Sequence, residues 1–512
     1  MATSPAALAK KLLGILIHDR DTHLLRIDAY VRGEQDDPYM PANADDEYKL
    51  LARRAVTNVM PFIENTPAQA MYVDSFRRGR TAEKSKSQVE SLVKTQAVQP
   101  EWDHWQKSRL DARQSAVYRG AFRFGHSFVL TEKLRDGGVR SKGLSALRTS
   151  AVYEDPANDC DPFAVLTVTA WPKSDDDKPV PGKARMWDGV YEYAVTFESM
   201  SDFSKGFTTK RLKKHGAQEC PVTRFAASVD LEGRTVGVVE PMIELQNRIN
   251  QTVFDLLIVQ SFASFKVRTV SGMAPPIKMR AVDEDGNTVD NPEANPNLVA
   301  DWIPLLDASG RPVPDDINVN AKRFLFAEDP DTHFSTLDET PLDGFIKAIE
   351  MAFRHMAALS QTPPHHILGE IANLSAEALQ AAETALLRKV EEFKSLFGES
   401  WERVFRIAAQ IGEFEGQDDF AGEVIWRDME SKSLAQAGDA LGKLREQLGI
   451  PARGLWARVP GVTATELSHW EDLSEQEDGQ LQMAQALTRA NNSPRPTFRQ
   501  PSDSTTTGAT AA

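Results

Sequence analysis

The sequence predicts an α+β protein in which a mixed body carries two long helices with a small β insertion between them. The first observation is a stretch from 151 to about 239 that holds short runs of β-branched and aromatic residues. The second is a set of long segments with apolar residues at three- and four-residue steps. The clearest strands are 164–170 and 191–197, and the long helices are 241–265, 341–361 and 375–412. A chain of 512 residues is too long for one compact core, so we expect about two to four substructures.

The formal net charge of −15 constrains the partners. Proteins that grip duplex DNA usually present a basic surface, because neutralising phosphates drives that binding. The charge therefore argues against tight DNA binding. It is equally compatible with a surface past which DNA slides, and charge alone does not decide between the two.

The cysteine count and the N-terminal pattern argue against a disulfide-rich, a secreted or a membrane protein. The two cysteines, Cys160 and Cys220, stand in unrelated contexts, so neither a CxxC metal site nor a disulfide framework is expected, and we expect two reduced thiols. The apolar run at 12–17 is too short for a secretory signal. The sequence contains no run of about eighteen apolar residues, so no membrane-spanning helix is expected.

The N-terminal region predicts helices separated by polar loops. Helical spacing covers the first 35 residues, and it returns over 47–65. The pattern from 102 to 124 predicts one further helix, closed by Gly125 and followed by a strand over 127–131.

The two helices that flank the insertion predict self-association. The helix at 241–265 would be roughly 36 Å long, and the apolar face of such a protruding pair lies in water unless it packs against other copies. Between the helices, short strands are expected at 266–270, 277–280 and 324–326.

The helix at 341–361 carries three charged candidates. Lys347 and Arg354 lie seven residues apart and therefore on one face, while Glu350 and Arg354 have the favourable i, i+4 spacing. The two cations would face phosphates or pair with a neighbouring copy, and the nearby Glu350 favours pairing.

A loop is expected after this helix, and a very long helix follows the loop. The candidate site residues in the loop are Thr362, Pro363, Pro364, His365, His366 and Gly369. Ser375 is a plausible N-cap for the helix that ends near Gly412, with Gly398 as the expected kink. The chain should continue with a strand at 422–428, helices at 434–448 and 466–490, and a disordered tail from 491.

Sequence signatures of catalysis are missing. The chain has no P-loop, dinucleotide-binding, zinc-protease or nucleophile-elbow motif. The segment 283–286 favours a hairpin turn over a calcium loop, because Ala281 and Pro292 occupy its terminal ligand positions. The pair His365 and His366 lacks a third ligand at a supportive spacing, so we expect no metal, no cofactor and no enzymatic activity.

Other residues with chemical potential have simpler interpretations. His126 and Ser127 are expected to begin a strand, and the carboxylates at 175–177 to lie in a solvated loop rather than act as acid–base partners. Trp102 and Trp105, at helical spacing, are expected to anchor a core.

Several stretches, in a fixed order, resemble a known family. They are Trp105 to Gln114 with Gly120 and the run 124–129, the run 237–250, Gln361 to His365 with Gly369, the run 373–379 with Glu383, and the run 397–402. Together they resemble the portal proteins of long-tailed phages, in particular the group of actinobacterial phages related to the portal of a Bacillus phage. The resemblance covers most of the chain, best from about 100 to 475.

The resemblance implies a portal fold with a mixed α/β wing, a two-helix stem, a β clip, a long kinked helix and an α-helical crown. The implied segments are the wing (1–237 and 375–430), first stem helix (238–265), clip (266–337), second stem helix (338–361), tunnel loop (362–374), crown (431–490) and tail (491–512).

The resemblance also implies partners and a location. Proteins of this kind form a ring of about twelve copies at one capsid vertex, in the virion, after assembly in the host cytoplasm. Double-stranded DNA would pass through the ring during packaging and ejection without sequence-specific binding. The ring would contact the terminase large subunit, the major capsid and scaffolding proteins and a head–tail adaptor, and no membrane. The alternative is another phage minor capsid or connector protein, and a nuclease or hydrolase is the alternative from a different class.

Overall fold

The structure is a computed structural model that falls into two compact units. Unit 1 comprises Met1–Asp36, Asn58–Asn247 and Phe353–Ala512, and unit 2 comprises Asp37–Thr57 and Arg248–Ala352. The described residues are 4–41, 45–78, 100–158, 161–173, 180–264, 268–271, 277–289, 292, 296–313, 333–336, 341–369, 376–427, 434–456 and parts of 458–483.

Unit 1 begins with a helix interrupted by one wider turn. α1 (Pro5–Asp19) continues through a π-helical turn (Arg20–Leu24) into α2 (Leu25–Arg32). Ser4 caps the start by accepting a hydrogen bond from the Ala7 backbone, and Gly33 ends α2 in the left-handed conformation. The predicted N-terminal helix is confirmed, whereas the π turn has no signal in the sequence.

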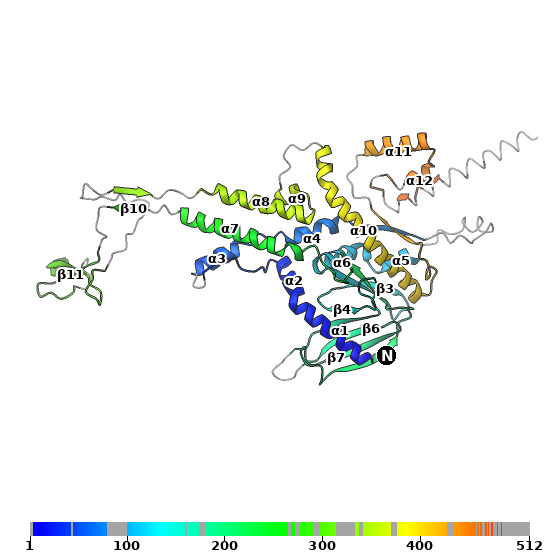
Figure 1. Ribbon diagram of the computed structural model, residues 1–512, viewed down its shortest axis with the longest axis horizontal. Coiled ribbons are helices and arrows are strands. Elements are labelled where there is room, and N and C mark those ends of the chain that lie inside the picture. Colours follow the sequence, from blue (N-terminus) through cyan, green and yellow to red (C-terminus); the bar gives the residue numbers. More distant parts are fainter. Residues whose placement is uncertain are drawn as a thin grey trace, which may run out of the picture. The chain divides into compact units, whose positions relative to one another are not determined.

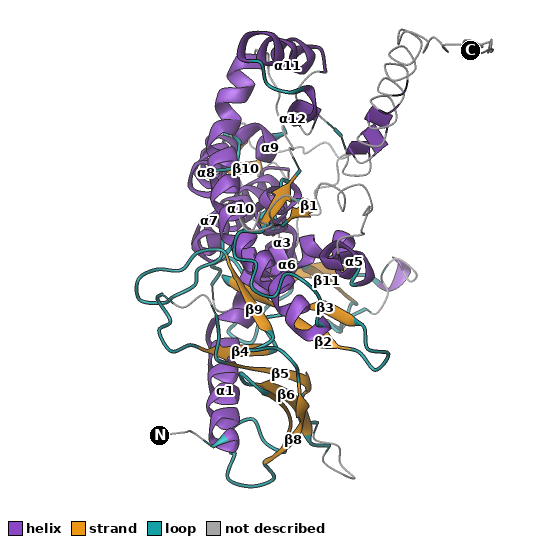
Figure 2. Cartoon of the chain, turned by 90° about the vertical axis from the view of Figure 1, so that its right-hand side faces the viewer, coloured by secondary structure: helices purple, strands orange, loops and turns teal. Residues whose placement is uncertain are grey.

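A five-stranded antiparallel sheet confirms the predicted β region (Figure 2). Its order is β4 (Thr149–Val152), β5 (Ala164–Ala170), β6 (Gly182–Trp187), β7 (Tyr191–Phe197) and β8 (Thr208–Lys214). β5 and β7 have the bounds predicted for them. Leu12, Leu13 and Leu16 of α1 pack against the apolar face of this sheet, which explains the helical spacing of the N-terminus.

A second sheet, of three strands, has the order β3 (Val139–Leu144), β2 (His126–Lys133) and β9 (Val222–Ala226). His126 begins β2, as predicted. The expected single helix at 102–124 is wrong, because α5 (Pro100–Lys107) and α6 (Leu110–Phe124) are separate helices. Arg109 separates them with a φ of 56°, a left-handed backbone that no helix interior contains.

The predicted helix at 47–65 is likewise two helices. α3 (Asp46–Ala55) belongs to unit 2, and α4 (Met60–Gln69) belongs to unit 1. Val56 adopts an extended backbone where α3 stops, so the helical spacing continues across a break in the backbone hydrogen bonds.

The core of unit 1 forms around α10 (Ala376–Gly412), the long helix predicted from 375. Trp401 of α10 lies edge-on to Trp105 at 4.8 Å between ring centroids, and its indole nitrogen donates to the Tyr118 hydroxyl at 2.9 Å. Both tryptophans are fully buried, which confirms Trp105 as a core anchor. Hydrogen-bonded helix continues through Gly398, the expected kink.

Short elements complete unit 1. β1 (Val73–Arg77) pairs with β14 (Glu423–Trp426), which lies within the strand predicted at 422–428. α11 (Leu434–Leu448) has the predicted bounds, and α12 (Ala452–Trp456) follows it. Most of the predicted helix at 466–490 and the whole tail lie outside the described residues.

Unit 2 contains the insertion and most of the two predicted helices that flank it, 241–265 and 341–361 (Figure 1). α7 (Ile243–Ser264) follows a 3-10 turn (Glu240–Met242), and α8 is Asp343–Ser360. Within the described residues, the insertion holds two antiparallel strand pairs, β10 (Arg268–Ser271) with β13 (His333–Thr336) and β11 (Met279–Val282) with β12 (Asp301–Pro304). Two of the three predicted strands overlap β10 and β11, and 324–326 lies outside the described residues.

Specific contacts hold α3 against α7 within unit 2. Phe254 packs on Ala52 and Ala55. The Asn250 side chain accepts a hydrogen bond from the Thr57 backbone at 3.1 Å, and the Gln251 side chain accepts one from the Tyr39 backbone at 2.7 Å. The polar residues at the centre of α7 therefore satisfy the backbone of a neighbouring segment.

One turn and one thiol match the sequence interpretation. Asp283 to Gly286 is a hairpin turn in which the Gly286 amide donates to the Asp283 carbonyl at 3.0 Å. Cys220 is buried and free, and burial raises its pKa to about 12. Cys160 and 175–177 lie outside the described residues. Within the described parts, no helix is both long and apolar enough to cross a membrane.

Candidate functional site

The candidate segment after α8 begins with a tight helix end. The Thr362 amide donates to the Ala357 carbonyl at 2.9 Å, and the Gln361 amide donates to the Ala358 carbonyl. This pair of bonds is a Schellman motif, and Gln361 supplies its left-handed residue with a φ of 55°. A residue other than glycine has a strained backbone in this conformation, so the surrounding contacts must stabilise the turn.

The expected loop at 362–374 is partly a helix, which corrects the sequence interpretation. Pro364–Leu368 forms α9, with Pro364 at the first helical position and Gly369 as its left-handed cap. The sequence signals for this short helix were the second proline of the pair and the glycine that follows. Residues 370–374 lie outside the described part of the chain.

The candidate residues of this segment differ in exposure. Thr362 and Pro363 are buried in unit 1, while Pro364, His366 and Gly369 are exposed and His365 is half-buried. Only this second group has surface available to a ligand in the isolated chain.

The two histidines have an acidic neighbour that the sequence interpretation missed. Glu383 of α10 places its carboxylate beside them, and the donor atoms of His365, His366 and Glu383 lie within 4.8 Å of one another. Burial and the nearby His365 lower the pKa of His366, and the Glu383 charge opposes this shift. The expectation that no third ligand stands nearby is therefore wrong, because Glu383 of α10 lies beside both histidines of α9.

The three charged candidates of α8 are all exposed. Lys347, Glu350 and Arg354 lie on the same helix as predicted, and within the described residues Lys347 has no ion pair or hydrogen bond. Large apolar side chains of α8 are exposed as well, with Ile346 at 47%, Met351 at 55% and Leu359 at 66%.

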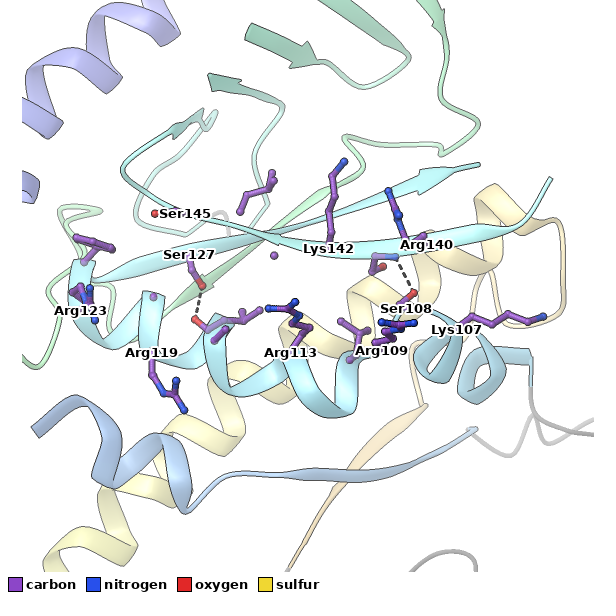
Figure 3. Close-up of a pocket in the computed structure, with 18 residues that line it drawn as sticks. Lys107, Ser108, Arg109, Arg113, Arg119, Arg123, Ser127, Arg140, Lys142 and Ser145 are labelled. Atoms are coloured by element: carbon purple, nitrogen blue, oxygen red, sulfur yellow. Dashed lines mark hydrogen bonds between the residues drawn. The ribbon is translucent and has the colours of Figure 1, made fainter. Parts of the chain in front are cut away.

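A pocket in unit 1 is the feature that sequence reasoning did not find (Figure 3). It lies between α6 and β3 with a volume of about 880 Å³. Its charged lining residues are all cationic: Lys107, Arg109, Arg113, Arg119, Arg123, Arg140 and Lys142. The available signal was a run of arginines from 109 to 123 in a chain whose net charge is −15.

Local folding positions these cations. Ser108 accepts a hydrogen bond from the Ser141 amide at 3.0 Å and so fixes the α5–α6 junction against β3. The Ser127 hydroxyl donates to the Val117 carbonyl at 2.8 Å and fixes α6 against β2. Figure 3 shows the cations distributed along the whole pocket, with Lys107 and Arg109 near one end and Arg123 near the other.

Comparison with known proteins gives two portal proteins of mycobacterial phages. The portal protein of Mycobacterium phage L5 is 34% identical over 125 residues, and that of Mycobacterium phage D29 is 32% identical over 125 residues. Each alignment spans 24% of this chain and 26% of the relative, so it covers about a quarter of either protein.

A family model described as "Phage portal protein, SPP1 Gp6-like" matches residues 15–480. The match includes the five-stranded and three-stranded sheets, α7 and α8 with the insertion between them, α9 and the long α10. The order of elements predicted from the sequence and the extent of this match agree: the chain belongs to the SPP1 Gp6-like family of phage portal proteins.

Proposed function

We propose that this chain is one subunit of a closed ring of about twelve copies at a single vertex of a phage capsid. Double-stranded DNA passes through the ring when the genome is packaged and again when it is ejected. The observation that carries the proposal is the family match over residues 15–480.

The exposed apolar residues of α8 support a ring. Ile346, Met351 and Leu359 stand at different angles around the helix, so no single contact within one subunit covers them. Large apolar side chains exposed on a long helix are typical of surfaces that pack against other subunits. In this proposal α7 and α8 are the stem and the insertion between them is the clip.

The charge supports passage of DNA rather than tight binding. A net charge of −15 gives a long-range field that repels phosphates, so DNA in contact with such a ring is not held by counterion release. The residues from 362 to 374 form the tunnel segment in this proposal, with His365 and His366 nearest to the DNA. The wing comprises 1–237 and 375–430, and the crown 431–490.

The partners follow from the same proposal. The clip side docks the terminase large subunit during packaging and a head–tail adaptor afterwards. The outer surface contacts the major capsid and scaffolding proteins, during assembly in the host cytoplasm and then in the virion. The ring itself performs no catalysis. The alternative is a different minor capsid or connector protein of the phage.

Electron microscopy of the purified chain tests the ring. We expect particles with an axial hole and about twelvefold symmetry, formed by the chain alone or with its capsid and scaffolding proteins. Monomers under both conditions would contradict the proposal, and an open chain of subunits would favour the connector alternative.

Variants of the tunnel segment test the DNA path. Changing His365 and His366 together to Ala leaves the buried Thr362 and Pro363 intact, so rings should still form. We expect fewer packaged genomes, measured as nuclease-protected DNA per capsid. Normal packaging in these variants would remove the tunnel assignment while leaving the ring in place.

A further inference from the structure

The basic pocket between α6 and β3 carries more positive charge than its own subunit neutralises. Four of its seven cations have acidic partners that lie outside the lining: Lys107 pairs with Asp103, Arg123 with Glu64 and Asp28, and both Arg140 and Lys142 with Glu132. Arg109, Arg113 and Arg119 have no ion pair and no hydrogen bond to their side chains among the described residues. Of these three arginines, Arg109 and Arg113 are exposed, so the pocket offers about two uncompensated charges to a partner.

Arg119 shows that part of this charge is unsatisfied away from water. Its Nε is buried and has no hydrogen-bond partner. A buried donor without an acceptor costs about 1–3 kcal/mol, and more when the group is charged. Figure 3 shows the Arg119 side chain on the side of α6 away from β3, so the charges that face incoming groups in the pocket are those of Arg109 and Arg113.

The uncharged lining distinguishes between a polypeptide and a single-stranded nucleic acid. The uncharged lining consists of small side chains, which are four serines, Ala116, Gly120 and Gly143, and of apolar ones such as Leu110 and Leu144. Single-stranded nucleic acid needs exposed aromatic rings for stacking, whereas Phe124, the aromatic residue of the lining, is only 7% exposed. Arginines beside small and apolar side chains are typical of a protein–protein contact.

We propose that this pocket receives a carboxylate-bearing segment of a second copy of this chain. The inference rests on the proposed ring and adds a specific contact to it. Copies that each carry a charge of −15 repel one another at long range. A ring can close only if that repulsion is offset locally, and a basic pocket on one copy facing acidic side chains of the next provides such an offset.

Charge reversal at the two exposed arginines tests the contact. Arg109→Glu with Arg113→Glu changes residues without partners in the isolated subunit, so circular dichroism and the melting temperature should match the wild type. At a protein concentration where half of the wild-type copies are in rings, we expect at least a tenfold lower fraction in rings. The neutral pair Arg109→Gln with Arg113→Gln should give an intermediate loss.

The matched control reverses two cations elsewhere in unit 1. Lys205→Glu with Lys210→Glu makes the same change in net charge at exposed residues that also have no partners among the described residues. This control should assemble to within twofold of the wild type. An equal loss of assembly in the control would mean that net charge, and not the pocket, is responsible, and would overturn the inference.

Zero-length crosslinking identifies the partner. A carbodiimide joins lysines to carboxylates, and Lys107 and Lys142 line the pocket. In rings mixed from ¹⁴N- and ¹⁵N-labelled copies, we expect mixed-isotope crosslinks from these lysines to Asp or Glu. Crosslinks only within one copy, such as Lys107 to Asp103 or Lys142 to Glu132, would overturn the inference.

Two results separate this inference from the proposed function. Absence of wild-type rings, alone or with capsid and scaffolding proteins, contradicts the ring itself. Normal rings in the Arg109→Glu, Arg113→Glu variant contradict only the pocket contact. If those rings form normally but retain a labelled DNA duplex less well than the wild type, the pocket is a phosphate site and the second-copy assignment is wrong.

Discussion

The Lys389 ammonium of α10 donates a hydrogen bond to the backbone carbonyl of Ser360, the last residue of α8, at 2.8 Å. A cation at a helix C-terminus stabilises the helix dipole and satisfies a carbonyl that has no partner inside the helix. This contact fixes the end of α8 immediately before Gln361 reverses the chain direction, and therefore positions the segment that carries His365.

Lys389→Met tests the charge of this contact. Burial lowers the pKa of Lys389 to about 8, against 10.5 for a free lysine, with Glu392 opposing the shift. The unfolded chain therefore binds more protons between pH 8 and 10.5, so the wild type should gain stability as pH rises through this window. The free energy of unfolding should rise by on the order of 2–3 kcal/mol through this group, and the Lys389→Met variant should lack this rise. Urea denaturation at pH 7.5 and 10.5 measures it, and equal gains in both proteins would contradict the assignment.

Replacement of Arg403 should destabilise unit 1 severely. Its side chain is 2% exposed, pairs with Asp161 at 2.7 Å and donates to the Val222 carbonyl at 2.9 Å. Arg403→Met leaves the buried Val222 carbonyl without this donor and removes the ion pair with Asp161, and we expect a loss of about 3–5 kcal/mol in urea denaturation. Arg406→Met is the matched control on the same helix; its half-buried side chain contacts Phe420 and should cost less than about 1 kcal/mol.

Mild acid should destabilise the protein through buried histidines. His104 is 3% exposed, lies 3.0 Å from the Ser141 hydroxyl, and burial lowers its pKa to about 4. The unfolded chain binds this proton near pH 6.5, so stability is complete above that pH and falls between 6.5 and 4. His104→Gln should have a shallower pH dependence, by up to about 3 kcal/mol over this window. His126, whose pKa is also about 4, accounts for part of the remaining slope.

Polar substitutions on α8 should separate folding from assembly. Ile346→Ser with Leu359→Ser changes side chains that are already exposed, so the melting temperature should fall by no more than about 2 °C. Ring formation should fall at least tenfold, measured by sedimentation. Leu231→Ser, in an exposed turn, serves as the control. Equal assembly in all three proteins would contradict a stem contact at these residues.

The sequence predicts regular elements well where one periodicity dominates. β5, β7 and α11 have the predicted bounds because runs of β-branched and aromatic residues, or helical spacing, persist over their full length. It does not predict the breaks at Arg109 and at Val56, because their neighbours keep helical spacing while the backbone leaves the helix. Those breaks depend on tertiary contacts, such as the hydrogen bond from the Ser141 amide to Ser108.

In the candidate site, too, the sequence predicts local turns but not contacts between separate elements. Proline and glycine signals predict a turn around 362–369, and they also explain α9 after the fact. Neither Glu383 beside the histidines nor the convergence of Arg113 with Lys142 follows from spacing along the chain, because each pair is brought together by a chain reversal between separate elements. The sequence predicts which side chains of one helix share a face. Which side chains of two different elements lie close together can be known only from the fold.

The exposed charges on the edge strand β8 affect how identical copies behave when they lie close together. It lies at the edge of the five-stranded sheet and presents exposed Lys210, Arg211, Lys213 and Lys214. An open strand edge is a template for β-sheet growth between identical molecules, and a row of like charges makes that growth unfavourable. In the proposed ring, where many copies would lie side by side at high local concentration, this charged edge keeps the copies from merging into a continuous β-sheet.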